Sequence, residues 1–378
     1  MLNRAGMLLA VAGLLAGLLG VSSPMADPAG AATSAAPDVS AFTFLTGAVA
    51  LSPSDAWAVG WAGVTGTTVL FSESLHWNGR EWASVHVGPG ANVNGLESVS
   101  ATSPSNVWSV GFQSAGPLIE HYNGRTWATV PCPYQGGASR LSGVDARTAS
   151  DAWAVGWVNP GSGQLALAEH WNGKRWTQVT TAPAGGSYAE LNSVIDLGPG
   201  SALAVGDYQT ESRGTDVWHE LAERWNGHAW QRVGVPAFGT SSSLAGIAGG
   251  AAAGVTAVGY VTSGGHAVPL IERWNGTGFV RVTQPAGSGY LGAVTVVSRT
   301  SAYAVGETGS GTILVEHGNG TRWTRVSAPG PADGAYLTSV AAAPSGSFVV
   351  SVGSHGPELS ERPLIEQGNG KTWRIARD

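Results

Sequence analysis

The sequence predicts an all-β fold, a seven-bladed β-propeller with four antiparallel strands per blade, because three landmarks recur seven times in one order. Each copy starts with a leucine, reaches an Ala/Ser-Val-Gly glycine fifteen residues later (sixteen in the last copy), and then an asparagine followed four positions on by an aromatic residue. The landmarks of the seven copies are Leu45, Gly60 and Asn78; Leu96, Gly111 and Asn123; Leu141, Gly156 and Asn172; Leu191, Gly206 and Asn226; Leu244, Gly259 and Asn275; Leu291, Gly306 and Asn319; and Leu337, Gly353 and Asn369.

Each copy contains four short segments of strand type, as the second one illustrates. "LESVSA" (96–101) and "VWSVGF" (107–112) are separated by a turn, and "LIEHY" (118–122) and "RTWATV" (125–130) are joined by Asn-Gly. Asn-Gly between aromatic strands is a strong hairpin signal, since both residues accept a positive φ. A proline often follows the fourth segment, which suits an outer edge because proline cannot donate to a strand ladder.

The first segment of each copy also predicts that the copies form a ring. Two positions after each landmark leucine lies a small residue, as expected where seven innermost strands converge on an axis. The final copy ends after its fourth strand and the first copy begins with its first, so we expect the ring to close without a borrowed strand. These small residues are Gly47, Ser98, Gly143, Ser193, Gly246, Ala293 and Ser339.

Over about residues 45–378 the chain resembles the secreted kelch-like and Asp-box-like propellers, a superfamily that includes galactose oxidase-type folds. The "WNGxxW" hairpins carry the likeness, because they are similar in placement to the "DxGxxW" boxes between the third and fourth strands of a blade. The resemblance implies the architecture. It implies no activity, since the Cys–Tyr cross-link of the copper oxidases and the arginine trio of the sialidases have no counterpart identified in this sequence.

Composition excludes some partners. Only 12% of the residues are charged and the formal net charge is −6, so the field of the whole molecule repels nucleic acid and anionic lipid. We therefore expect no nucleic-acid partner. Separately, the protein is expected to be a monomer.

The N-terminus predicts export. A short basic start is followed by an apolar run at 5–21 and by small residues, the pattern of a signal peptide over 1–26 with cleavage at about Ala26 to Ala32. Residues 27–40 form an Ala/Pro-rich linker and 41–378 the propeller. The alternative is an uncleaved membrane anchor; cleavage would leave a secreted protein without a membrane segment.

Two repeated features have a structural interpretation. Six glutamates share one position in the third strand, and a carboxylate repeated around a ring cannot converge on one substrate, so we interpret them as structural: Glu120, Glu169, Glu223, Glu272, Glu316 and Glu366. Trp57, Trp108 and Trp153, with the aromatic residues beside Asn-Gly, are expected between blades. Cys132 is the single cysteine and is expected to be a passive loop residue without a disulfide.

The connections between the second and third strands are the best candidates for a binding face. From the landmark glycine to the asparagine the spacing is 18, 12, 16, 20, 16, 13 and 16, and length variation on a rigid scaffold is where binding is usually carried. The longest connection, interpreted as a loop over 207–220, is polar and charged. The alternative for the aromatic members is that they cap blade packing. The candidate ligand-binding residues are Trp61, Phe112, Trp157, Asp207, Arg213, Trp218, His219, Tyr260 and Glu307.

Two classes of function fit these observations. The first is a secreted non-catalytic recognition module for a glycan, a cell-envelope polymer or a surface protein. The second is an extracellular enzyme acting on glycans, a glycosidase or lyase with carboxylate acid and base residues. Because no nucleophile elbow, zinc helix motif or metal-spaced histidine pair occurs, we assign no catalytic residue, cofactor or metal.

Overall fold

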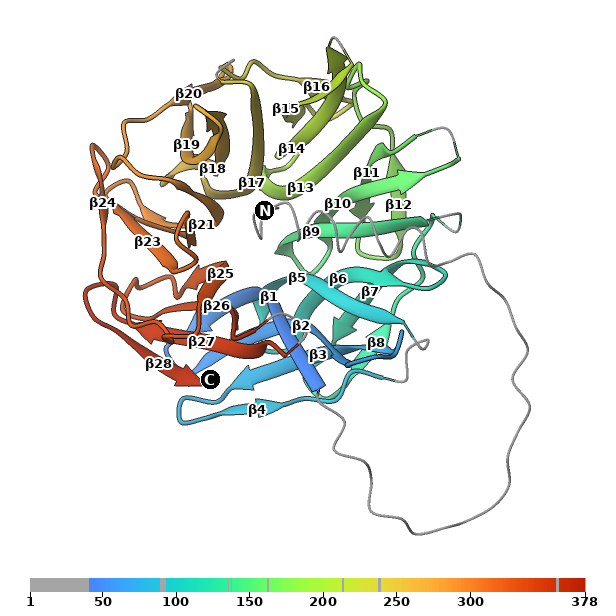
Figure 1. Cartoon of the computed structure of the whole chain (residues 1–378). Coiled ribbons are helices and arrows are strands. Elements are labelled where there is room, and N and C mark those ends of the chain that lie inside the picture. Colours follow the sequence, from blue (N-terminus) through green and yellow to red (C-terminus); the bar gives the residue numbers. More distant parts are fainter. Residues whose placement is uncertain are drawn as a thin grey trace.

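The fold prediction is confirmed by a computed structural model, which describes residues 41–88, 93–134, 136, 138–161, 163–212, 214–236, 239–357 and 360–377. The described chain forms seven four-stranded antiparallel sheets, each made of four consecutive strands and arranged radially around an axis (Figure 1). The proposed signal peptide and linker lie outside the described residues. Within these residues, no helix is long and apolar enough to cross a membrane.

The strands take the same place in every blade. The innermost strands are β1 (Ala41–Ser52), β5 (Asn94–Ser103), β9 (Ala138–Thr148), β13 (Tyr188–Gly198), β17 (Ser241–Gly250), β21 (Gly289–Ser298) and β25 (Ala335–Ala342). The second strands are β2 (Asp55–Val64), β6 (Asn106–Gln113), β10 (Asp151–Asn159), β14 (Ser201–Ser212), β18 (Gly254–Ser263), β22 (Ser301–Thr308) and β26 (Val349–His355).

The outer half of each blade is shorter. The third strands are β3 (Leu70–Trp77), β7 (Gly116–Tyr122), β11 (Leu165–Trp171), β15 (Thr215–Trp225), β19 (His266–Trp274), β23 (Ile313–Gly318) and β27 (Arg362–Gly368). The outermost strands are β4 (Trp82–Ser84), β8 (Trp127–Thr129), β12 (Trp176–Val179), β16 (Trp230–Arg232), β20 (Phe279–Arg281), β24 (Trp323–Arg325) and β28 (Trp373–Arg377). Because strand direction alternates, the two–three connections and the inter-blade links share one side, called here the two–three face. The one–two and three–four turns share the other, called the turn face.

The landmark glycine is required by a close approach between the two inner strands. A Cβ built on Gly156 would overlap the carbonyl oxygen of Arg140, and the equivalent overlap occurs at the other six landmark glycines. The inner strand is irregular at this place, with a register shift between Leu141 and Gly143 in blade three. The repeated Gly therefore reflects a bulge that any side chain would disrupt.

The small residues two positions after the leucine face the next blade, as the sequence predicts. A Cβ on Gly47 would lie 3.0 Å from Cα of Ser98, and one on Gly143 would lie 2.9 Å from Cα of Ser193. Where the residue at this position is serine, its hydroxyl oxygen accepts a hydrogen bond from a backbone N–H of the next inner strand. In blade two, for example, the amide of Val144 donates to Ser98 Oγ at 3.3 Å. The inner strands thus bond to each other as well as pack.

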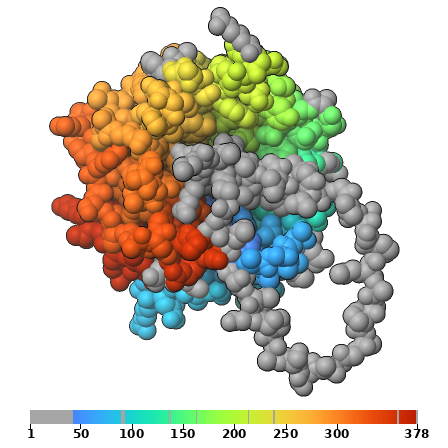
Figure 2. Space-filling model, viewed as in Figure 1, coloured from blue at the N-terminus to red at the C-terminus, as the bar shows by residue number. Residues whose placement is uncertain are grey.

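The ring closes without a borrowed strand, which confirms the sequence prediction. Strand β1 packs on β25 and β26, and Thr338 Oγ1 donates to the carbonyl oxygen of Leu45 at 2.6 Å. The amide of Ala48 donates to Ser339 Oγ at 3.1 Å, the same bond that Ser98 makes elsewhere in the ring. On the face drawn in Figure 2, the yellow, orange and red parts of the chain lie against each other without a gap.

The Asn-Gly hairpins differ in detail from the predicted two-residue turn. Trp171 pairs with Trp176, so four residues, 172–175, form the loop. Oδ1 of Asn172 accepts the amides of Lys174 and Arg175, both at 3.1 Å, and Gly173 supplies the positive φ of 84°. The asparagine is therefore used for its side chain, in an Asx turn.

Aromatic side chains pack between blades, as predicted. The Trp57 ring lies on His76 at a centroid distance of 4.3 Å, and the next blade contributes Tyr122 at 4.7 Å and Trp127 at 5.5 Å. Nε2 of His76 is bonded to Oδ1 of Asp55 at 2.9 Å. His76 thus supports a tryptophan, as His121 and His170 do in blades two and three.

The six repeated glutamates are buried, which confirms the structural interpretation. Glu169, Glu223, Glu272, Glu316 and Glu366 have no exposed area and Glu120 has 3%. Where a partner is present it comes from the neighbouring strand or link: Thr129 Oγ1 donates to Glu120 at 2.7 Å and the amide of Ala182 donates to Glu223 at 3.0 Å. These carboxyl groups belong to the blade interior.

Cys132 is buried rather than lying in an open loop. Its thiol donates to Oε1 of Glu169 at 3.1 Å, and burial, followed by the nearby Glu169 carboxyl, raises the pKa of the thiol. A thiol that resists ionisation is a poor nucleophile, which agrees with the predicted passive role.

Candidate functional site

The candidate residues that follow the landmark glycines lie on the two–three face, each opposite a residue of the innermost strand. These pairs form a band around the ring, called here the belt. The pairs are Phe44 and Trp61, Gly95 and Phe112, Arg140 and Trp157, Glu190 and Asp207, Ser243 and Tyr260, Tyr290 and Glu307, and Tyr336 and Ser354.

Blades one and two contribute an aromatic cluster to the belt. The ring of Phe44 lies 4.4 Å from that of Trp61, Phe42 lies 6.1 Å from Trp61, and Phe112 lies 6.5 Å from Trp61. All four side chains are half-buried. The cluster packs against itself and keeps ring surface accessible, so the packing role and the binding role predicted for Trp61 and Phe112 are compatible.

Blade three contributes a cation to the belt. The guanidinium of Arg140 lies 6.0 Å from the ring centroid of Trp157, 3.7 Å from Glu97 and 4.0 Å from Glu190. Trp157 is 8% exposed, so little of its ring is open to a ligand. Burial raises the pKa of Glu97 despite the opposing effect of Arg140.

Blade four contributes two buried carboxyl groups side by side. Asp207 Oδ2 accepts Ser243 Oγ at 2.5 Å and Asn192 Nδ2 at 3.2 Å. Burial, with the neighbouring Glu190 charge, raises the pKa of Asp207 to about 8. Burial and the same two carboxylates raise the pKa of Tyr260 to about 12.

The two acidic candidates lie inside the blade boundaries. Asp207 and Glu307 are each 3% exposed, and Tyr290 donates to Oε2 of Glu307 at 3.1 Å. Both carboxyl groups therefore hold belt residues in place in this conformation, whereas Trp61, Phe112 and Tyr260 are half-buried and accessible.

The longest two–three connection is a hairpin, which corrects the predicted loop over 207–220. Strands β14 and β15 pair continuously, from the pair of Asp207 and Glu220 to the pair of Ser212 and Thr215. This pairing satisfies the backbone hydrogen-bonding groups of the long polar extension. The ring of His219 lies 5.0 Å from Tyr208, and its Nε2 is bonded to Thr210 Oγ1 at 2.8 Å. Trp218 is half-buried in the same hairpin, and Arg213 lies outside the described residues.

The inner strands enclose a central channel of about 400 Å³. Its wall carries Glu97 near the two–three face and Asp145 and Asp196 nearer the turn face. Burial raises the pKa of Asp145 to about 6, and its Oδ2 accepts the amide of Asp196 at 2.8 Å. In the described part of the chain, no group of three His, Cys, Asp or Glu side chains could hold a metal ion.

Sequence reasoning missed Arg140, Glu97 and Glu190, which link blades two, three and four. The signal was present, because these residues flank the landmark leucines where other blades carry small or aromatic residues. Their proximity follows from three different blades meeting at the axis.

Comparison with known proteins supports the fold alone. No protein-family model and no curated protein matches the sequence. A GH74 xyloglucanase from Xanthomonas campestris is similar at a TM-score of 0.60 and 13% identity, over 90% of this chain and 55% of that chain. The β-propeller domain of the Trilobed protease from Pyrococcus furiosus is similar at 0.54 and 7%, over 89% and 96%.

A third similar structure is a PL25 ulvan lyase, at a TM-score of 0.51 and 9% identity, over 90% of this chain and 97% of that chain. The chain is therefore a seven-bladed β-propeller, and the solved structures that it is similar to in fold include a xyloglucanase and an ulvan lyase. The finer kelch-like and Asp-box-like resemblance stays a prediction.

Proposed function

We propose that the protein is a secreted, non-catalytic recognition module that binds a glycan or cell-envelope polymer through the two–three face, with a surface protein as the other ligand class. The observation that carries the proposal is the aromatic cluster of Phe42, Phe44, Trp61 and Phe112 in blades one and two, together with the Arg140 guanidinium of blade three, which lies 3.7 Å from Glu97 of blade two. Sugar rings stack on aromatic faces, and a guanidinium bonds hydroxyl or carboxylate oxygens.

The distribution of exposed apolar side chains supports the same face. Among the described residues, five large apolar side chains are exposed: Val69, Phe71, Leu165, Tyr188 and Val280. The first four lie in or next to a two–three connection or at the start of an inner strand, all on the two–three face. Exposed apolar groups gathered on one face favour a contact surface.

Secretion is part of the proposal and rests on the basic start, apolar run and small residues of 1–26. The polymers that an exported protein meets lie outside the cytoplasm.

The alternative, a glycan-acting enzyme, is favoured by one observation. Asp207 and Glu190 are adjacent carboxyl groups, and a pKa of about 8 for Asp207 suits a general acid. Against it, Asp207 is 3% exposed and already bonded to Ser243 and Asn192. A proton donor must reach the substrate oxygen, so binding is the better-supported function.

Affinity electrophoresis in gels that contain xyloglucan, a polyuronate or solubilised peptidoglycan tests the proposal. We expect retardation by one polymer class, and loss of about tenfold or more in affinity on Trp61→Ala or Arg140→Gln, because each removes a stacking or charge-assisted contact. Val280→Ala, an exposed apolar residue of β20, is the control and should leave mobility unchanged.

Two outcomes would contradict the proposal. Release of new reducing ends or unsaturated products from the same polymers would show an enzyme. Equal retardation of the wild type and both belt variants would place the binding surface elsewhere.

A further inference from the structure

The boundary between blades five and six lacks side chains that fill the other boundaries. At the boundary of blades two and three, the Trp108 ring contacts His121 at 4.3 Å, Trp171 at 4.9 Å and Trp176 at 5.3 Å. Counting from the landmarks, blade five carries Thr256 in the position of Trp108, and blade six carries Gly318 in the position of Trp171. Two large rings are thus missing from facing positions.

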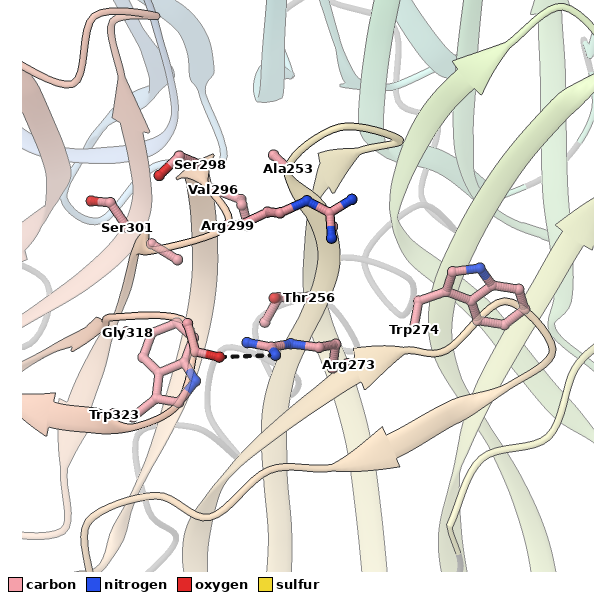
Figure 3. A pocket seen from close by; sticks show the side chains of 13 residues that line it. Ala253, Thr256, Arg273, Trp274, Val296, Ser298, Arg299, Ser301, Gly318 and Trp323 are labelled. Carbon is pink, nitrogen blue, oxygen red and sulfur yellow. Dashed lines mark hydrogen bonds between the residues drawn. The ribbon is translucent and has the colours of Figure 1, made fainter.

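The missing rings leave a pocket on the turn face. It has a volume of about 320 Å³, and Thr256, Gly318 and Trp323 line it. Trp323 keeps the position of Trp176 and is 4% exposed, so one indole wall is retained. Figure 3 shows Arg273 lying across the pocket toward Gly318 and Trp323, with Arg299 on the other side of Thr256 in this view.

Other boundaries that lack the inner tryptophan are filled by a different side chain. Leu203 of blade four belongs to the same core cluster as Phe279, with Trp274 packed against it. Tyr303 of blade six lies 6.1 Å from Trp373. At the closing boundary, Phe348 stacks 6.3 Å from Trp77. A purely structural drift of the repeat would be expected to end in repacking of this kind, whereas the boundary at Thr256 keeps a pocket.

The same boundary has also changed its charge. Arg273 stands where other blades have His76, His121 or His170, and Gly254 stands where they have the aspartate or asparagine that bonds the histidine. Arg273 Nη1 donates to the carbonyl oxygen of Gly320 at 3.0 Å. A cation thus takes the place of the histidine of blades one to three, without the Asp or Asn partner.

The second cation of the pocket is Arg299, whose Nε donates to the carbonyl oxygen of Ala252 at 2.8 Å. Neither arginine has an ion pair among the described residues, and no carboxylate lines the pocket. Two unpaired guanidinium groups thus share a pocket in a protein with a formal net charge of −6. The positive charge in this pocket, opposite in sign to the net charge of the protein, attracts an anion.

We infer that this pocket is a second ligand site, separate from the belt and on the opposite face, and that it binds a small aromatic carboxylate. The ring of the ligand occupies the space of the missing indoles against Trp323, and its carboxylate bonds Arg273. Guanidinium forks bind carboxylates in a bidentate manner, and the volume lies in the range of small-molecule sites, about 300–1,000 Å³.

Isothermal titration of the full exported chain with indole-3-acetate tests the inference. We expect saturable binding with one site per chain, and affinity lower by about tenfold or more for the neutral analogue indole-3-ethanol and for Arg273→Gln, because each removes the charge-assisted contact. Arg224→Gln changes the equivalent, exposed position of blade four and is the matched control, with affinity unchanged.

Refilling the pocket gives an independent check. Thr256→Trp restores the residue found in blades one to three, and its indole meets Arg273, a favourable cation–π pair. We expect this variant to fold with an equal or higher Tm and to lose binding. Absence of binding by the wild type, equal binding by Thr256→Trp, or tighter binding of glucuronate than of indole-3-acetate would each overturn the inference.

Discussion

Replacement of Trp108 by alanine should lower the free energy of unfolding by about 3–5 kcal/mol, the usual cost of removing a buried aromatic ring. Trp108 is 2% exposed and contacts His121 in its own blade and Trp171 and Trp176 in the next. The substitution therefore opens a cavity at a boundary where two blades are held together. Thermal unfolding followed by circular dichroism should show a fall in Tm on the order of 5 °C or more.

The control for this prediction is Trp218→Ala. Trp218 is half-buried in the blade-four hairpin and outside the repeated inter-blade positions, so its loss should cost much less. An equal loss of stability in both variants would show that the repeated tryptophans hold no special place in the packing of the ring.

Raising the pH from about 7 to about 9.5 should destabilise the protein, because its buried carboxyl groups bind protons more tightly in the folded state. Burial raises the pKa of Glu272 and Glu366 to about 8, and that of Glu169, Glu223 and Glu316 to about 7, from an ordinary value of 4.5. A carboxyl group whose pKa is higher in the folded state than in the unfolded state stabilises the folded protein fully at a pH below its unfolded-state pKa. This stabilisation is lost as the pH rises through the folded-state pKa.

The expected size follows from the pKa values. One pKa unit corresponds to about 1.4 kcal/mol. Raising the pH above 7 therefore removes roughly that much stabilising free energy for each group with a pKa of about 8. Together the groups should lower Tm by about 5 °C. Starting at about pH 7 keeps His121 and His317 neutral at both ends, since burial lowers their pKa values.

Glu366→Gln is the test variant for the pH dependence. Its side chain is uncharged at every pH, so the fall in Tm between the two pH values should be smaller than in the wild type. A wild-type Tm that is constant or rises over this interval would contradict the assignment of protonated, buried carboxyl groups.

The architecture was predictable from the sequence because each repeated landmark has one physical cause. The landmark glycine marks a backbone overlap that excludes a side chain, as at Gly156. The asparagine marks an Asx turn, although the sequence alone suggested a shorter one. Small residues such as Gly47 mark the approach of inner strands at the axis. Seven copies of such constraints in one order leave little freedom in the fold.

The candidate site was only partly predictable, since its contacts join residues of different blades. Trp61 and Phe112 were selected by their place after a landmark glycine, but Arg140 and Glu97 come from neighbouring blades and meet near the axis. The burial of Asp207 depends on Ser243 of the next blade. Local sequence also gave no sign that residues 207–220 pair with each other, because polar extensions fit a loop and an exposed hairpin equally well.

The empty boundary between blades five and six was visible in the sequence only as two separate exceptions to the repeat. Thr256 and Gly318 lie in different copies, more than one blade length apart along the chain. Their effect becomes clear once the second strand of one blade is known to face the third strand of the next, as Trp108 faces Trp171.

The most direct test of the proposed recognition function is a crystal structure of the protein with an oligosaccharide cut from the polymer that it retains. We expect sugar rings stacked over Trp61 and Phe112 on the two–three face, with a ring oxygen substituent bonded to the guanidinium of Arg140. An oligosaccharide bound on the turn face or along the outer strands, with the belt unoccupied, would contradict it.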